Sequence, residues 1–243
     1  MPPLEKRLSS ARHEVERRRA ARPLGDLEAA VADLPQIRPF TEAMSGEEID
    51  FVLRLEAADA SPLRAAEENE VAGLAASIEA LGGLSRLTAL PLLLTDVIVD
   101  PYQLYEARLA GAGGVVLIAA AFSDEDDHDH MSDLYSLAGS IGLDVIVEVS
   151  DEDEIEHSLE LLDPDSFLVR NRAEDGGVVD FERTFSLLEE VPAGKFVLSQ
   201  GGVREREEVE ALERAGVDAV ILGPWAVAGD LAATLRVLRG ESR

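Results

Sequence analysis

Residues 91–119 read as a strand, a helix and a second strand joined by very short turns. The apolar run at 91–94 is continuous rather than alternating, which is typical of a parallel strand covered on both faces. Asp100 can cap the helix that follows, and Pro101 suits its first turn, where the missing N–H costs nothing. A glycine-rich turn at 111–114 then ends the helix. Because such crossovers join neighbouring parallel strands, the segment predicts a parallel α/β fold.

The same alternation repeats along the rest of the chain. Eight strands are predicted, near residues 49–57, 71–78, 90–95, 115–120, 144–149, 166–169, 196–199 and 219–222. Helices are predicted at 101–110, 132–141, 151–161, 180–190, 204–215 and 229–239. Eight strands with interleaved helices favour an α/β fold of the (β/α)8 type, a TIM barrel. A doubly wound open sheet is the alternative, but no glycine-rich dinucleotide fingerprint follows any strand.

Two short helices precede the first strand, at residues 4–20 and 24–34. We therefore expect an N-terminal helical extension, residues 1–45, packed on the barrel, and the (β/α)8 barrel itself at 46–243. The extension is expected to cover one end of the barrel.

The first βα unit is shortened. Only about two helical turns fit between residues 61 and 71. The segment 82–89 is similarly short. We expect this side of the barrel to be thin or partly open.

Composition limits the class of protein. The chain has 243 residues, of which 46% are hydrophobic, enough for one large globular core. No window approaches the roughly 18 uninterrupted apolar residues of a membrane span, and the N-terminus lacks an apolar signal core, so we expect a cytoplasmic protein. Without cysteines it has no disulfide and no thiolate nucleophile. The sequence leaves the oligomeric state open.

The charge balance is strongly acidic: 49 acidic residues against 22 basic ones give a formal net charge of −27. Nucleic acid is a poor partner, because binding it needs a cationic surface. A high-salt cytosol would screen the self-repulsion, since the Debye length falls to about 3 Å at 1 M salt. We therefore hypothesise a halophile-type protein.

This hypothesis predicts that the chain is more stable in molar KCl than in dilute buffer, because salt screens repulsion among its carboxylates. Thermal unfolding followed by circular dichroism in both solutions measures the difference. Equal melting temperatures in the two would contradict it.

Several motifs together identify a family. The most specific are Asp-Pro-Tyr-Gln-Leu-Tyr-Glu-Ala-Arg at 100–108 and Leu-Asp-Val-Ile-Val-Glu-Val at 143–149. Weaker matches lie at residues 4–6, 14–15, 22–24, 38–40, 60–62 and 222–223. On these residues the chain resembles the indole-3-glycerol-phosphate synthase family of tryptophan biosynthesis over essentially its whole length. The resemblance implies a TIM barrel whose chemistry lies at the carboxyl ends of the strands.

The family closes an indole ring on 1-(o-carboxyphenylamino)-1-deoxyribulose 5-phosphate and releases carbon dioxide and water. The resemblance implies that Glu148 is the general base and that Glu56 is a second catalytic carboxylate. It implies substrate-binding roles for Ser61, Arg170, Asn171, Arg172, Gln200, Gly201, Gly202 and Gly223. The expected partner is a small phosphorylated substrate, and neither a metal nor another cofactor is expected.

Other positions depart from the family pattern. Thr95 and Ala58 stand where the family has lysines, and Arg170 stands where it has an asparagine. Gln200 replaces a glutamate, and Pro224 follows Gly223 without an N–H to offer a phosphate. A threonine hydroxyl cannot replace the lysine acid near neutral pH, and losing one such acid typically costs roughly 10²–10⁴-fold in rate.

The retained residues also allow structural roles. Glu56 could pair with Arg170 or Arg54, and both Arg170 and Arg172 could form salt bridges instead of binding an anion. The Gln-Gly-Gly turn at 200–202 precedes an acidic helix, so it predicts either a phosphate cradle or a plain tight turn.

Three functions therefore remain open, and with them whether the chain is an enzyme. The first is the family reaction with weakened or altered activity. The second is a non-catalytic paralogue that binds a small phosphorylated ligand or a pathway partner. The third is a different lyase or isomerase on the same scaffold. For the third, the Asp/His-rich loop 124–130 could supply a divalent metal, although a solvated acidic loop is the alternative.

Overall fold

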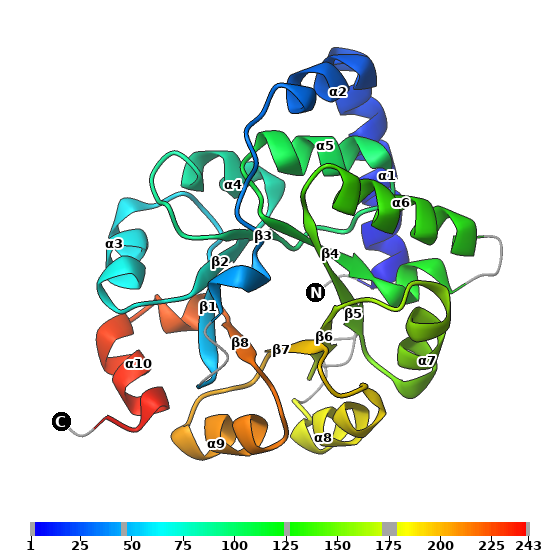
Figure 1. Ribbon diagram of the computed structural model, residues 1–243. Coiled ribbons are helices and arrows are strands. Elements are labelled where there is room, and N and C mark those ends of the chain that lie inside the picture. Colours follow the sequence, from blue (N-terminus) through cyan, green and yellow to red (C-terminus); the bar gives the residue numbers. More distant parts are fainter. Residues whose placement is uncertain (1–2, 45–47, 124–126, 172–178, 242–243) are drawn as a thin grey trace.

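The computed structural model describes residues 3–44, 48–123, 127–171 and 179–241, and its central feature is a closed ring of parallel strands (Figure 1). Strands β1 to β8 pair in chain order, and β8 closes on β1. Their bounds are Asp50–Arg54, Gly73–Ala76, Leu92–Leu94, Gly114–Ile118, Asp144–Val149, Ser166–Arg170, Phe196–Gln200 and Ala219–Leu222. The predicted (β/α)8 barrel is confirmed.

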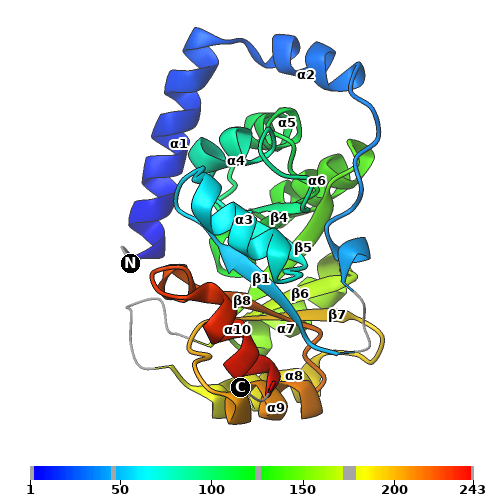
Figure 2. The same cartoon turned by 90° about the vertical axis from the view of Figure 1, so that its left-hand side faces the viewer.

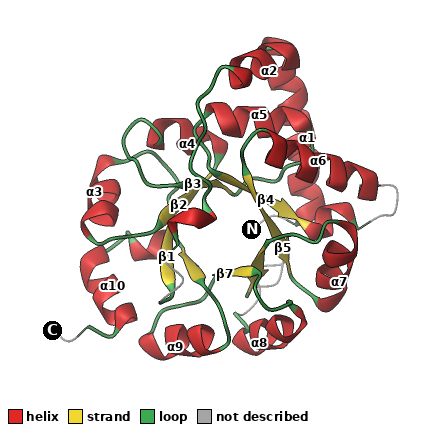
Figure 3. Cartoon of the chain, viewed as in Figure 1, coloured by secondary structure: helices red, strands yellow, loops and turns green. Residues whose placement is uncertain are grey.

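The helices surround the strands (Figure 3). Helices α1 and α2 are Leu4–Ala21 and Leu24–Ala32. Helices α3 to α10 are Ala60–Glu68, Ile78–Leu84, Pro101–Leu109, His128–Ser140, Glu152–Leu161, Phe181–Glu190, Arg206–Arg214 and Leu231–Arg239. In the described ranges, the short 3₁₀ helices η1, η2 and η4 are Thr41–Ala43, Ala119–Phe122 and Pro224–Ala226. In the described chain, no helix is both long enough and apolar enough to span a membrane.

The side of the barrel at β1–β3 is thin but not open. Arg54 pairs with Ala75 and Ala76 pairs with Leu94, so the sheet is continuous there. The thinness lies in α4, which has seven residues, because α3 has nine, as many as α5, α9 and α10. The expectation of a partly open side is wrong, because the buried apolar strands pair even where the covering helices are short.

Phe40 closes the amino end of the barrel. Its side chain has no exposed surface, and it packs against glycines at the starts of two strands, β2 and β4. A Cβ atom on Gly73 would lie 2.8 Å from the Phe40 ring, and one on Gly114 would lie 2.9 Å from the Phe40 Cβ. These glycines are therefore required by the close approach of an aromatic plug.

Helix α1 lies at the opposite end of the barrel from Phe40. It runs across the carboxyl ends of β1–β3, while the chain after α2 passes along the barrel to reach β1 (Figure 2). Val15 on α1, Leu27 on α2 and Tyr102 on α5 form a separate buried cluster. Apolar contacts of this cluster hold α1 and α2 on α5.

The polar residues of the 100–108 motif also hold this arrangement together. The Asp100 side chain caps α5 by accepting from the Tyr102 N–H at 2.8 Å. The Tyr102 hydroxyl donates to the Arg22 carbonyl at 3.1 Å, and Gln103 donates to the Val97 carbonyl at 2.7 Å. Arg108 donates to the Ile141 carbonyl at 2.9 Å. The most family-specific motif is thus structural in this chain.

Candidate active site

A buried ion pair stands at the carboxyl ends of β5 and β6. Glu148 is 5% exposed, and its Oε1 accepts a hydrogen bond from Nη2 of Arg170. Both side chains are largely shielded from solvent, at 7% and 11% exposure. The guanidinium charge offsets the cost of burying the carboxylate, and it orients one carboxylate oxygen. The structure thus joins two of the predicted site residues directly.

Asn171 follows Arg170 and is 1% exposed. Its amide nitrogen donates to the Ser199 hydroxyl and to the Gly201 carbonyl, both at 2.8 Å. Its amide oxygen accepts from the Thr184 hydroxyl. The whole side-chain amide therefore connects the end of β6 to the β7 turn and to α8.

The turn after β7 has an unusual backbone. Gly201 and Gly202 have φ values of 106° and 92°, a left-handed region that only glycine enters freely. Beyond the turn, the Glu208 carboxylate accepts from the backbone N–H groups of Arg204 and Glu205, at 2.6 and 3.0 Å. The amino end of α9 is therefore capped in part by its own side chain, and the N–H groups of the turn at Gly201 and Gly202 lie just before it.

The loops after β7 and β8 meet through an aromatic contact. The Arg204 guanidinium lies 3.9 Å from the centre of the Trp225 ring. Gly223 follows β8 beside this contact, and a Cβ there would lie 3.3 Å from the Trp225 ring. The contact gives this part of the mouth a cation stacked on an aromatic face.

The residues after β1 lie on the exposed rim. Glu56 and Ser61 are both exposed, and the Ser61 N–H donates to the Asp59 carboxylate at 3.0 Å. Asp59 thus caps α3. Glu56 forms no hydrogen bond or ion pair with another described residue. The alternative that it pairs with Arg170 or Arg54 receives no support.

The described site residues lie at or just beyond the carboxyl ends of β1, β5, β6, β7 and β8, on one end of the barrel. Among these described residues, Glu148 and Arg170 form an ion pair. Asn171 reaches the predicted turn through the Gly201 carbonyl. Arg172 lies outside the described residues.

The Asp/His loop is only partly described, because residues 124–126 lie outside the described ranges. Its two histidines have different surroundings: the His128 ring lies 4.0 Å from the His157 ring, and His130 hydrogen-bonds the Val99 carbonyl at 2.8 Å. No group of three or more His, Asp or Glu side chains that could hold a metal occurs in the described part of the chain.

A pocket of about 450 Å³ lies between α1 and the ends of β1–β3. Its floor includes Arg54 and Thr95, and its roof includes Lys6 and Arg18 of α1. Arg54 was not among the site residues predicted from the sequence. It could have been found as a charged residue at the end of an apolar strand, because residues at the carboxyl ends of barrel strands lie at the mouth.

Asp96 lies in the same pocket. Burial raises the pKa of its carboxyl group. The hydrogen bond that this group accepts from the Ile78 N–H, at 2.8 Å, and the positive charge of Arg54 both lower the pKa. Asp96 thereby holds the amino end of α4 against the end of β3.

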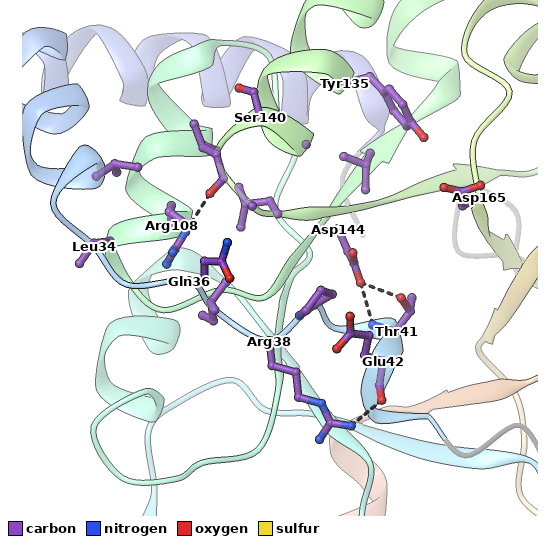
Figure 4. A pocket seen from close by; sticks show the side chains of 18 of the residues that line it. Leu34, Gln36, Arg38, Thr41, Glu42, Arg108, Tyr135, Ser140, Asp144 and Asp165 are labelled. Carbon is purple, nitrogen blue, oxygen red and sulfur yellow. Dashed lines mark hydrogen bonds between the residues drawn. The ribbon is translucent and has the colours of Figure 1, made fainter.

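A cavity of about 1050 Å³ lies at the other end of the barrel (Figure 4). Asp144 at the start of β5 accepts from the N–H and the hydroxyl of Thr41, at 2.8 and 2.7 Å. Arg108 and Arg38 bind carbonyl oxygens at its wall. This end of a barrel supports stability rather than chemistry, so the cavity is not the site of the reaction.

Glu154 is a half-buried carboxyl group on the first turn of α7, which follows β5. Burial raises the pKa of Glu154 to about 7, and the nearby charges of Asp151 and Glu148 also raise it. A hydrogen bond from the Ser150 N–H to the Glu154 carboxylate, at 2.6 Å, lowers the pKa and so opposes this rise. The folded protein therefore binds more protons than the unfolded chain between pH 4.5 and 7. The contribution of Glu154 to stability is complete below this window and is lost as the pH rises through it.

Glu154→Gln removes this titration and keeps an oxygen that can accept the Ser150 N–H. Relative to the unmodified protein, the variant should gain roughly 1–2 kcal/mol in free energy of unfolding between pH 5 and pH 8. Urea unfolding at both pH values measures the gain. Glu152→Gln, an exposed change on the same turn, is the control, and an equal gain there would rule out the explanation.

The fold and the mouth define a class: a (β/α)8 barrel with a buried carboxylate–guanidinium pair where such barrels carry their chemistry. A sequence model of "Indole-3-glycerol phosphate synthase" matches residues 70–238. The chain belongs to the indole-3-glycerol phosphate synthase family.

Individual relatives agree. An indole-3-glycerol phosphate synthase of Leuconostoc mesenteroides is 31% identical over 252 residues, covering 92% of this chain and 94% of that protein. One of Chlorobium phaeovibrioides is 32% identical, with 89% and 91% covered. Among solved structures, a mutant tryptophan synthase alpha-subunit of Pyrococcus furiosus has a TM-score of 0.60 at 13% identity, covering 81% of this chain and 99% of that one. At that identity the likeness concerns the fold alone.

Proposed function

We propose that this chain catalyses indole ring closure on 1-(o-carboxyphenylamino)-1-deoxyribulose 5-phosphate, with loss of carbon dioxide and water and with low turnover. The observation that carries the proposal is the buried Glu148 at the carboxyl end of β5, oriented by Arg170. A shielded carboxylate in a barrel mouth can accept a proton from a bound substrate. The reaction itself is inferred from the membership of the chain in the indole-3-glycerol phosphate synthase family.

In this proposal the two carboxylates have different tasks. Glu148 takes up the proton released when the ring closes, and Arg170 stabilises negative charge that develops beside it. Glu56, exposed on the rim, reaches the substrate from the β1 side. Asn171 is a positioning residue, because its amide holds the Gly201 carbonyl and the Ser199 hydroxyl.

The remaining predicted residues bind the substrate. Backbone N–H groups of Gly201 and Gly202 face the phosphate, and Gly223 permits close approach from β8. Ser61, Arg172 and Gln200 complete the proposed binding set. Turnover is low because Thr95 cannot protonate the ribulose oxygen as the family's lysine would.

Complementation of a tryptophan auxotroph that lacks this step tests the proposal. We expect the unmodified chain to restore slow growth without tryptophan and Glu148→Gln to abolish it. Growth that survives Glu148→Gln would mean that Glu148 is not the base. Equal protein levels of both variants must be verified by immunoblot.

A non-catalytic paralogue that binds a small phosphorylated ligand is the second candidate. It is favoured by the loss of both lysine positions, at Ala58 and Thr95, together with Gln200. Titration calorimetry with the substrate distinguishes the two: binding without any indole product favours the paralogue, and binding with product favours the enzyme.

We also retain three broader proposals. The chain divides into a helical extension at 1–45 and a barrel at 46–243, it works in the cytoplasm, and its acidic surface suits high salt. The position of α1 over the mouth supports the first of these, because it places the extension against the proposed site.

A further inference from the structure

The pocket between α1 and the ends of β1–β3 lies where the chain has lost the family's lysines. Thr95, at one lysine position, lines this pocket of about 450 Å³. Its hydroxyl faces the Ala76 carbonyl at 3.4 Å. The pocket therefore keeps its position in the barrel although its original cation at Thr95 is gone.

Arg54 brings a different cation to this pocket. It ends β1, is half-buried, and lines the pocket together with Thr95. Arg54 forms no hydrogen bond or ion pair with any other described residue. Its positive charge does interact electrostatically with the Asp96 carboxyl group. Asp96 is itself hydrogen-bonded to the Ile78 N–H at 2.8 Å. The guanidinium donors of Arg54 are thus available to a ligand.

Some of the other charges around the pocket are paired within the protein. Arg18 pairs with Glu106 at 3.1 Å, and Glu14 pairs with Arg17 at 2.7 Å. Arg54, half-buried beside Thr95, forms no ion pair with a carboxylate among the residues described. A guanidinium under a helical roof interacts more strongly with an anion than one in open solvent does.

We propose that Arg54 binds the aromatic carboxylate of the substrate in the pocket beneath α1, in place of the cations lost at Ala58 and Thr95. This inference rests on the proposed function. A guanidinium suits a carboxylate because its planar donors bind both oxygens at once. Arginine stays charged at all working pH values, so Arg54 supplies binding and orientation but no proton.

The assignment predicts that substrate binding and turnover separate in this chain. A lysine at the position of Thr95 would supply both charge and a proton. Arg54 restores the charge alone, from the neighbouring strand β1. The pocket is accordingly expected to hold the substrate well and to process it slowly.

Titration calorimetry with anthranilate, which carries the aromatic carboxylate but no sugar phosphate, tests the inference at low salt. We expect Arg54→Gln to weaken anthranilate binding at least 10-fold. Arg64→Gln, which changes an exposed arginine on α3, is the matched control and should bind anthranilate like the unmodified protein. Aniline, which lacks the carboxylate, should bind weakly and equally to all three proteins.

Unchanged anthranilate binding in Arg54→Gln would overturn the inference, as would aniline binding as tightly as anthranilate. Thermal unfolding of both variants verifies that each is folded. The proposed function is tested separately, by product formation that depends on Glu148. If Arg54 does not bind anthranilate, that product formation can still be observed. The two failures are therefore distinguishable.

Discussion

Glu148→Gln is expected to lower the rate of ring closure by roughly 10²–10⁴-fold, the usual contribution of a positioned general base. The amide keeps the size of the side chain and an oxygen for the hydrogen bond from Arg170. It cannot take up a proton, so binding is retained while turnover is lost. Indole-glycerol phosphate fluorescence after addition of the substrate measures the rate, and calorimetry measures the binding.

The control for this prediction is Glu156→Gln, because Glu156 is an exposed carboxylate on α7 outside the mouth. It should leave the rate unchanged. If Glu148→Gln retains more than about a tenth of the rate, Glu148 is not the general base. Since Arg170 loses its charged partner in the variant, thermal unfolding must accompany the kinetics.

Phe40→Ala is expected to lower the free energy of unfolding by about 3–5 kcal/mol, as a fully buried aromatic truncation does. Phe40 has no exposed surface and fills the amino end of the barrel against Gly73 and Gly114. The truncation leaves a cavity that the surrounding strands cannot close. Urea unfolding followed by circular dichroism measures the loss.

A double variant sharpens this prediction. Gly73→Ala alone should cost about 1–3 kcal/mol, because its new Cβ would lie 2.8 Å from the Phe40 ring. In Phe40→Ala/Gly73→Ala the ring is absent and that clash is relieved, so the double variant should lose less than the sum of the single losses. Strict additivity would mean that the two residues do not share one packing site.

The sequence predicted the barrel well, because buried parallel strands leave continuous apolar runs that turns separate. All eight predicted strands overlap the observed ones. The limits are less accurate: the first strand was predicted to residue 57 but β1 ends at Arg54, and Ile78 begins α4 instead of ending a strand. Strand ends depend on pairing partners, which the local pattern does not contain.

The candidate site was predicted only in outline. Motif matching gave Glu148 and Arg170 separately, but their contact depends on the register of β5 and β6, in which Glu148 pairs with Leu168. The hydrogen bonds of Asn171 depend on three elements distant in sequence. Arg54 was missed as a site residue because the position of α1 over β1–β3 is not evident from the sequence.

The central claim is that an indole-forming pocket survives here with its carboxylate base intact and its lysine acid lost. The most direct measurement adds the anilino-deoxyribulose phosphate to the purified chain in excess and records product fluorescence over many turnovers. We predict slow, catalytic accumulation of the indole product that disappears with Glu148→Gln. Tight binding with no product above the Glu148→Gln background would contradict the claim.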